Sequence, residues 1–283
     1  MIVEILWIAL ILLILASILP ERYRRNRFLI GAAGWFFFAI HWAIQPLHYL
    51  EIDDYFNVIL VLVVSLFCLI VSHAMIRNYR HYEDTENTLL TLTTASALGG
   101  LFYYPFAEIE ILNTFLISMV REQVLYVLHV LNEPAQLTVD ENQIELIELN
   151  GHEIRIILAC TAIESIAIFT GLIFCVRASV KRTVIAFIAS IPVIYMLNLV
   201  RNTFVVVATG YDWFGEHTFQ IAHYVWVLNS FDIAHNYIAK IGSGIALFVI
   251  AYVVLQVLPE LLDAIDRLFA ILRVYIKGEG RMR

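Results

Sequence analysis

The sequence is low in charged residues and in cysteine. Only 15% of its 283 residues are charged, against about 25% in soluble proteins, and 61% are hydrophobic. A water-soluble domain of this size could not bury that much apolar surface. The composition therefore excludes a soluble enzyme, a disordered chain and a nucleic-acid-binding protein, and it indicates a protein that crosses the membrane several times.

The few cysteines exclude two further classes of protein. There are three, and no two of them form a C-x-x-C pair, so neither a disulfide framework nor a structural zinc site is expected. The histidines of the segment 210–236 match no common helical spacing of metal ligands. We therefore expect no metal and no other cofactor, and we expect one cysteine to be free and functional.

Long apolar segments predict the fold class. Each is long enough to cross the hydrocarbon core as a helix. The predicted spans are 2–19, 28–44, 56–76, 89–104, 161–176, 183–209 and 237–258. The sequence thus predicts an all-α polytopic membrane protein with about seven transmembrane helices.

The basic residues predict the orientation of these spans. Fourteen of the 18 lysines and arginines lie in the tail 259–283 or in the segments that follow the first, third and fifth predicted spans, 2–19, 56–76 and 161–176. Cytoplasmic loops carry the excess of basic residues, so the N-terminus is predicted outside and the tail, an amphipathic helix, on the cytoplasmic surface. The other four basic residues fall on the outer half and are candidates for function: Arg121, Arg155, Arg201 and Lys240.

The segment 105–159 is predicted to lie on the outer face. Residues 108–131 are typical of an amphipathic interfacial helix. Two apolar-alternating runs, 142–149 and 153–159, flank Asn150-Gly151, which is a strong signal for a β-hairpin. The predicted organisation is a single integral membrane domain, 1–283, in four parts: 1–104 with four spans, 105–159 with the outer helix and hairpin, 160–258 with the spans of the candidate site, and the tail 259–283.

Cys160 is the cysteine best placed to react. It lies where the predicted hairpin runs into the span 161–176, which puts it at a helix N-terminus on the outer face. Unpaired N–H groups and the helix dipole favour a thiolate there, so Cys160 is a candidate nucleophile. Cys68 and Cys175 lie inside apolar runs, where a small buried side chain explains them.

Two later segments bring basic side chains to the same depth. Arg201 follows the inner start of its span by eighteen residues, or about 27 Å of helix, and Asn198 and Asn202 flank it in a polar stripe. His235 and Lys240 lie at the outer start of the last span. A thiolate, a cation for the oxyanion and a histidine to move protons suit acyl-transfer chemistry.

These motifs resemble those of the exosortase/archaeosortase family, and its archaeosortases in particular. They are Ala-Cys-Thr-Ala-Ile-Glu-Ser at 159–165, Val200-Arg201-Asn202 and a basic residue near the start of the next span. The resemblance implies a membrane transpeptidase acting on surface proteins whose C-terminal sorting signal comprises a short motif (Pro-Gly-Phe among archaeosortases), a transmembrane helix and a basic tail. It implies cleavage on the outer face and transfer of the new C-terminus to a membrane lipid.

The resemblance also implies residue roles and leaves alternatives open. Cys160 would be the nucleophile and Arg201 its cationic partner. The third position is His235, as in exosortases, or Lys240 in place of the arginine of archaeosortases. A cysteine protease that only hydrolyses is one alternative function. A transporter is another, although no inverted repeat is visible and the polar residues gather at the outer face rather than the midplane.

Overall fold

The computed structural model describes residues 2–51, 55–81, 87–141, 143–221 and 224–277. Contacts between Cα atoms divide the chain into two compact units. Unit 1 comprises residues 1–102, 167–183 and 258–283, and unit 2 comprises 103–166 and 184–257. The four-part organisation expected from the sequence stays a prediction. Residues 278–283 of the predicted tail, with Arg281 and Arg283, lie outside the described residues.

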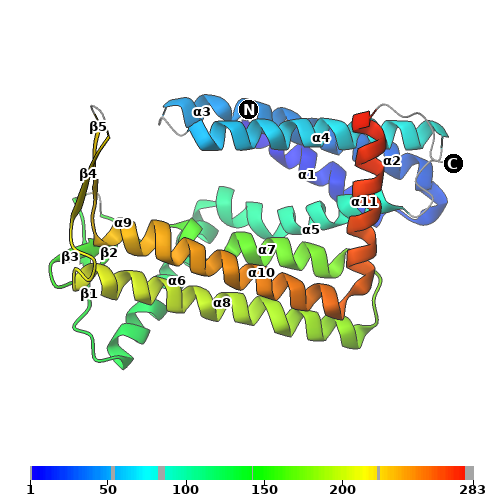
Figure 1. Ribbon diagram of the computed structural model, residues 1–283. Coiled ribbons are helices and arrows are strands. Elements are labelled where there is room, and N and C mark those ends of the chain that lie inside the picture. The colour runs from blue at the N-terminus through cyan, green and yellow to red at the C-terminus, as the bar shows by residue number, and fades with distance from the viewer. Residues whose placement is uncertain (1, 52–54, 82–86, 142, 222–223, 278–283) are drawn as a thin grey trace. The chain divides into compact units, whose positions relative to one another are not determined.

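Unit 1 is helical (Figure 1). Its elements are α1 (Ile2–Ile18), η1 (Glu21–Tyr23), α2 (Arg24–Ile44), α3 (Pro46–Glu51), α4 (Tyr55–His81), most of α5 (Thr88–Glu108), most of α7 (Ile163–Phe174) and α11 (Pro259–Lys277). Helix α2 packs against both α1 and α4. Helix α11 contacts α4 and runs across it in Figure 1, as an amphipathic surface helix would.

Small side chains let the helices of unit 1 pack closely. A Cβ atom added at Gly31 of α2 would lie 2.5 Å from the end of the Met75 side chain of α4, so a larger residue there would require Met75 to move. Two buried serines of α4 donate hydrogen bonds to carbonyls of α2: Ser65 to Ala39 at 2.9 Å and Ser72 to Ala32 at 2.7 Å. Both devices, small residues and interhelical hydroxyl bonds, are typical of helix packing within membranes.

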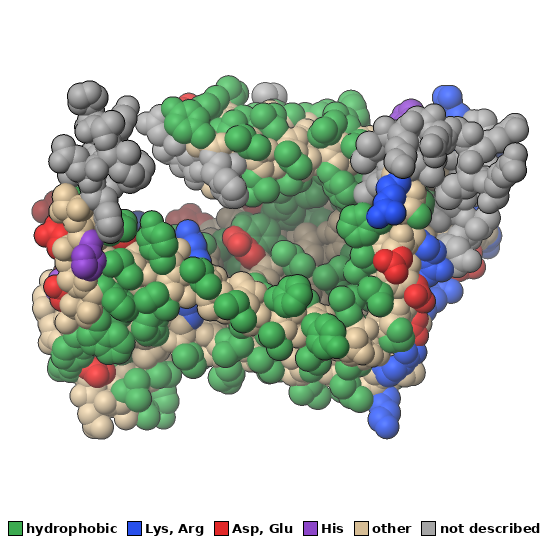
Figure 2. Space-filling model, viewed as in Figure 1, with side chains coloured by type: hydrophobic (Ala, Val, Ile, Leu, Met, Phe, Trp, Pro, Cys, Tyr) green, Lys and Arg blue, Asp and Glu red, His purple; other side chains and the backbone are tan. Residues whose placement is uncertain are grey.

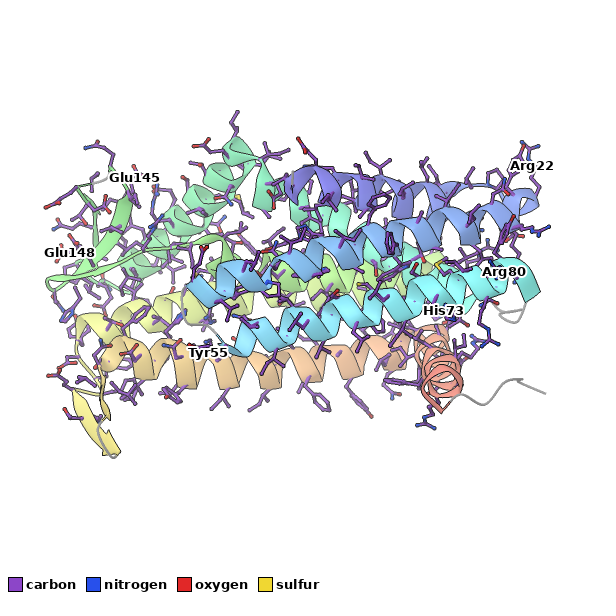
Figure 3. The ribbon with its side chains drawn as sticks, turned by 90° about the horizontal axis from the view of Figure 1, so that it is seen from above. Arg22, Tyr55, His73, Arg80, Glu145 and Glu148 are labelled. Carbon is purple, nitrogen blue, oxygen red and sulfur yellow. The ribbon has the colours of Figure 1, made fainter. Side chains whose placement is uncertain are left out.

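One end of unit 1 gathers the segments predicted to be cytoplasmic. Figure 3 shows Arg22 and Arg80 at the same end of these helices and Tyr55 at the other. Polar contacts join the segments there: Arg24 Nε donates to Asn87 Oδ1 at 2.7 Å, Arg177 pairs with Glu21 at 2.9 Å, and Arg182 pairs with Glu260. The predicted loops therefore share one end, and which side of a membrane this end faces stays a prediction.

Unit 2 combines helices with two small sheets. Its elements are α6 (Glu110–Val130), β1 (Gln136–Val139), β2 (Glu145–Leu149), β3 (His152–Ile154), η2 (Leu158–Cys160), α8 (Val180–Gly210, from residue 184), β4 (His217–Ile221), β5 (Tyr224–Leu228), α9 (Ser230–Asp232), η3 (Ile233–Ala239) and α10 (Lys240–Val257). Helices α8 and α10 lie side by side in Figures 1 and 3.

The strands include the predicted hairpin, which is β2–β3, and three further strands, β1, β4 and β5. Strands β2 and β3 pair antiparallel, with Leu149 opposite His152. The turn residues Asn150 and Gly151 have φ values of 54° and 84°, as a type I′ turn requires. Strand β1 adds to the other edge of β2, and β4 and β5 form a second hairpin. The sequence did not predict β1, β4 or β5, and residue 142 of the first predicted strand lies outside the described residues.

The core of unit 2 joins α6, β2 and α8. Val120, Val124 and Leu128 on one face of α6 are fully buried, as are Ile147 and Leu149 on β2. A Cβ atom at Gly210, the last residue of α8, would lie 2.6 Å from the Leu149 side chain. This close approach fixes the end of α8 against the three-stranded sheet.

The chain is a multi-pass membrane protein by the length and apolarity of its helices. Five candidate spans lie in the described residues: Glu21–Glu51, Asn57–Arg80, Glu110–Val130, Val180–Gly210 and Ser230–Val257. Large apolar side chains stay exposed along them, as contact with lipid would require, and Figure 2 shows them over α8 and α10.

The predicted spans match these helices in part. Four predicted segments, 28–44, 56–76, 183–209 and 237–258, fall on candidate spans, whereas 2–19 and 161–176 correspond to the shorter apolar helices Val3–Ile18 and Ile163–Phe174. The segment 89–104 lies in α5, which is not among the candidates. The predicted interfacial helix 108–131 is α6, which is long and apolar enough to span. The predicted count of seven is thus not established.

Candidate functional site

Cys160 lies in a tight turn before α7. It is the last residue of the 3₁₀ turn η2, and its N–H donates to the Ile157 carbonyl at 2.8 Å. Thr161 and Ala162 separate it from Ile163, where α7 begins, so Cys160 precedes the helix N-terminus predicted for it by three residues. Ala162 has a φ of 63°, a left-handed conformation that a side chain disfavours and that is often found at functional sites.

The backbone of Cys160 is bound to α8 by two side chains. The Nδ2 atoms of Asn198 and Asn202 each donate to the Cys160 carbonyl oxygen at 2.7 Å. Both asparagines are buried, with 9% and 4% of their surface exposed. They are four residues apart and so lie on one face of α8, where Arg201 directly precedes Asn202.

Arg201 contacts two of the neighbouring polar groups. Its Nη1 donates to Asn202 Oδ1 at 3.5 Å, and its Nη2 lies 3.5 Å from Nδ1 of His235. A guanidinium has donors only, so Nδ1 of His235 is the acceptor in this contact, and the proton of the neutral ring is then on Nε2. The structure therefore brings Arg201 and His235, two of the predicted site residues, into contact.

His235 is presented by an irregular helix. Residues Ile233–Ala239 (η3) form a π-helical stretch between α9 and α10, a rare geometry that often occurs at functional sites. The His235 ring stacks on Phe231 with centroids 5.0 Å apart and planes 9° apart. Asn229 and Asp232 form a capping box at the start of α9. The stacking restrains the imidazole, and the cap fixes the start of α9, which leads into η3.

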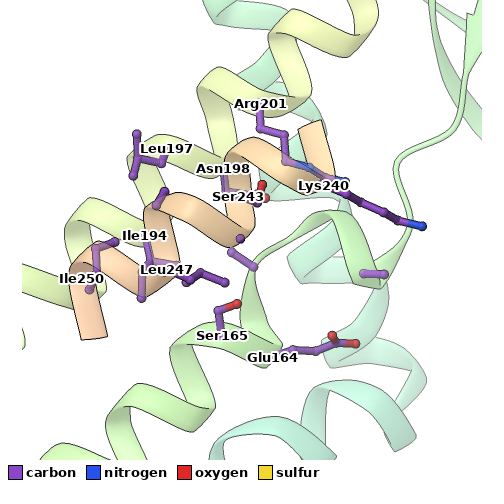
Figure 4. A pocket seen from close by; sticks show the side chains of 14 residues that line it. Glu164, Ser165, Ile194, Leu197, Asn198, Arg201, Lys240, Ser243, Leu247 and Ile250 are labelled. Carbon is purple, nitrogen blue, oxygen red and sulfur yellow. The ribbon is translucent and has the colours of Figure 1, made fainter. Parts of the chain in front are cut away.

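A pocket of about 320 Å³ adjoins this cluster (Figure 4). Glu164, Ser165, Asn198, Arg201 and Lys240 line its polar part. Ile194, Leu197, Leu247 and Ile250 are among the residues that line its apolar part. Figure 4 shows the Arg201 side chain extending from α8 toward the start of α10, where the side chain of Lys240 projects from the helix. A pocket with one polar and one apolar end fits an amphiphilic occupant.

The Cys160 side chain is buried beside this pocket. Ala159 and Ala162, close to it in the chain, line the pocket, whereas Cys160 is only 7% exposed and belongs to an apolar cluster that includes Leu199 and Val206. The structure thus links the Cys160 backbone to Arg201 through Asn202. Lys240 is exposed and shares the pocket with Arg201.

The other candidates have different surroundings. Arg121 is buried, with 7% of its surface exposed, and it pairs with Glu145 of β2 and with Glu122, which makes it a link between α6 and the sheet. Arg155 is exposed. Cys68 is buried in the core of unit 1. Among the residues that the structure describes, no group of three His, Cys, Asp or Glu is arranged to hold a metal ion.

Two parts of this arrangement were missed from the sequence. The sequence showed the polar stripe around Arg201 but not the hydrogen bonds from its two asparagines to the Cys160 carbonyl. A local sequence pattern cannot indicate a bond between residues about forty positions apart. The stacking of Phe231 on His235 is a contact at i, i+4. That spacing was visible in the sequence and could have indicated it.

Comparison with known proteins identifies relatives along nearly the whole chain. The model of the transmembrane exosortase family matches residues 5–255. Archaeosortase A of Natronomonas pharaonis is 27% identical over 270 residues, which cover 87% of this chain and 81% of the relative. Archaeosortase A of Haloferax volcanii is 26% identical over 279 residues, which cover 92% of this chain and 90% of the relative. No solved structure matches the chain.

Proposed function

The chain belongs to the transmembrane exosortase family, and we propose that it is a membrane-embedded cysteine transpeptidase. In this proposal it cleaves the C-terminal sorting signal of surface proteins on the outer face of the cell membrane. The signal comprises a Pro-Gly-Phe-type motif, a transmembrane helix and a basic tail, and the new C-terminus is transferred to a membrane lipid. The two archaeosortase A relatives support a sorting transpeptidase.

The observation that carries the proposal is the polar network around Arg201. It runs from His235 Nδ1 through the guanidinium to the Asn202 amide, and from there to the Cys160 carbonyl. The network connects a cation and a proton-transferring ring to the backbone of the residue that carries the thiol, and a thiol, a cation and such a ring are the three groups that acyl transfer needs. Its pocket has an apolar extension lined by residues of α8 and α10, where apolar side chains of a substrate or part of a lipid chain would fit.

The first half of the reaction forms a thioester. Substrate binding turns the Arg201 guanidinium from His235 to the scissile carbonyl oxygen, and this frees Nδ1 to accept the thiol proton of Cys160. The sulfur attacks the carbonyl carbon, and Arg201 stabilises the oxyanion. As the C–N bond breaks, the His235 imidazolium gives its proton to the leaving amine. A thioester and the free signal segment result.

The second half releases the product. An amine of the acceptor lipid attacks the thioester carbon, a C–N bond forms and the C–S bond breaks. His235 takes the proton of the attacking amine and returns it to the Cys160 sulfur, so that the enzyme is regenerated. If water attacks in place of the amine, the product has a free carboxylate, and the protein is a hydrolase.

The test compares three cysteine variants in cells that make a surface protein with a Pro-Gly-Phe signal. Cys160→Ala is expected to abolish processing, whereas Cys68→Ala and Cys175→Ala, the matched controls, retain it at equal membrane levels. Normal processing by Cys160→Ala would refute the cysteine mechanism. Mass spectrometry of the product C-terminus then separates lipid transfer from hydrolysis.

A further inference from the structure

We propose that Asn198 and Asn202 are positioning residues that hold the Cys160 backbone in register with the Arg201 guanidinium. This inference rests on the proposed function of Cys160 and Arg201. Neither asparagine is assigned a step on the reacting atoms. Their role is to fix the separation between the nucleophile and the cation, each on a different element.

The Cys160 carbonyl needs a partner that its own segment does not supply. In a continuing helix this oxygen would accept from an N–H of the next turn. Here Ala162, at a φ of 63°, turns the chain away, and the backbone bond at this junction runs from Ile166 N–H to the Ala162 carbonyl instead. Leaving a buried carbonyl without a partner is unfavourable, so this turn depends on donors from elsewhere.

Asn198 and Asn202 supply those donors at both lone pairs. Each Nδ2 lies 2.7 Å from the oxygen, and a carbonyl oxygen accepts two hydrogen bonds. Because the carbonyl is an acceptor only, each amide must present its NH₂ group to it. This leaves Asn202 Oδ1 facing Arg201 Nη1 at 3.5 Å. Asn202 therefore touches the cation with one end of its amide and the backbone of Cys160 with the other.

The geometry explains why two asparagines are used. A single bond would allow the Cys160 turn to pivot about it, whereas two bonds from residues one helical turn apart restrain it in two directions. Misplacement of reacting groups by about 1 Å costs on the order of a hundredfold in rate. The double contact is thus expected to act on kcat rather than on substrate affinity.

The test uses Asn198→Leu, Asn202→Leu and the double variant. Leucine has the same branched heavy-atom skeleton as asparagine but no polar atom, so the donor is lost while the branching of the side chain is kept. The matched control is Asn113→Leu, because Asn113 Nδ2 also donates to a backbone carbonyl, that of Phe106 at 2.9 Å, outside the cluster. All four proteins are purified, and processing of a Pro-Gly-Phe peptide is measured per mole of folded enzyme.

Each single variant is expected to lower kcat about tenfold and the double variant on the order of a hundredfold or more. KM should stay within about twofold, and the control should match the wild type. The reaction of Cys160 with a maleimide, followed in a Cys68→Ser, Cys175→Ser background, should change its rate in the double variant and not in the control. If the asparagines had a merely structural role, the variants would alter the yield of folded enzyme but neither kcat nor the rate of the maleimide reaction.

Other outcomes would overturn the inference separately from the proposed function. Wild-type kcat in the double variant, with Cys160→Ala inactive, would reject the positioning role and keep the cysteine mechanism. Full activity of Cys160→Ala would reject the mechanism itself. If the double variant does not fold, the single variants decide, and a wild-type kcat in both of them would reject the inference.

Discussion

The guanidinium of Arg201 lies against the imidazole of His235, with Nη2 3.5 Å from Nδ1. Because a guanidinium has no acceptor, the contact defines which ring nitrogen accepts a hydrogen bond. The two residues come from α8 and from the π-helical stretch before α10, and they are 34 positions apart in the chain. Their contact is a direct link between two of the basic residues that the sequence singled out for the site.

Replacing Arg201 by lysine should abolish most processing although the charge is kept. The planar guanidinium reaches Asn202 and His235 at once, and a single ammonium on a flexible chain does not reproduce this fork. We expect kcat to fall by about 10²–10³ at unchanged membrane levels. Arg155→Lys, at an exposed arginine, is the control and should leave kcat unchanged. Equal activity of Arg201→Lys would show that only charge matters there.

His235 and Lys240 can be separated as the third site residue by matched substitutions. His235→Gln removes the proton-transferring ring, whereas Lys240→Gln removes an exposed charge from the rim of the pocket. We expect a loss of about 10²–10⁴ in kcat for His235→Gln and less than about tenfold for Lys240→Gln. The measurement is the initial rate of peptide processing. The reverse order of effects would assign the third position to Lys240.

Breaking the link between Arg121 and Glu145 should destabilise unit 2. Removing Glu145 leaves a buried guanidinium that, among the described residues, pairs with the adjacent Glu122 alone. The expected cost is about 2 kcal/mol, below that of a fully buried pair because Glu145 is half exposed. Glu145→Gln should therefore lower the thermal midpoint more than Glu141→Gln, a control at an exposed acid. The double variant Arg121→Met, Glu145→Met is expected to recover part of the loss. A midpoint for Glu145→Gln equal to that of the control would contradict a structural role for the pair.

The hairpin turn is expected to weaken in acid. The Gly151 N–H, at 2.6 Å from Glu148, and then the Gln136 side chain hold the pKa of the Glu148 carboxyl below its ordinary value of 4.5. A carboxyl with a lowered pKa contributes stability above its unfolded pKa and loses it as the pH falls through the folded one.

The midpoint difference between the wild type and Glu148→Gln measures this contribution. It should be constant at neutral pH, begin to shrink near pH 4.5 and disappear at lower pH. Glu141→Gln again serves as the control. A difference that stays constant through this acid range would show that the carboxylate charge does not stabilise the turn.

Periodicity and composition identified much of the fold because those signals are local. Apolar runs located helices at most of their observed places, and Asn150-Gly151 predicted the β2–β3 turn because few residues other than asparagine and glycine adopt positive φ there. Strands β1, β4 and β5 were missed, since a run of four or five residues is too short for its periodicity to identify a strand. The predicted interfacial helix could not be distinguished from a span for a similar reason, because α6 is both amphipathic and apolar enough to cross.

The sequence by itself determined the class of protein and the residues worth testing. Scarce charges made Arg201 stand out, and the short motif around Cys160 pointed to the family. Only the tertiary structure decided which of these residues meet: Arg121 pairs with Glu145, Arg201 contacts His235, and two asparagines of α8 hold the Cys160 carbonyl. The physical reason is that a hydrogen bond depends on separations of a few ångströms between elements far apart in the chain, and packing alone sets those separations.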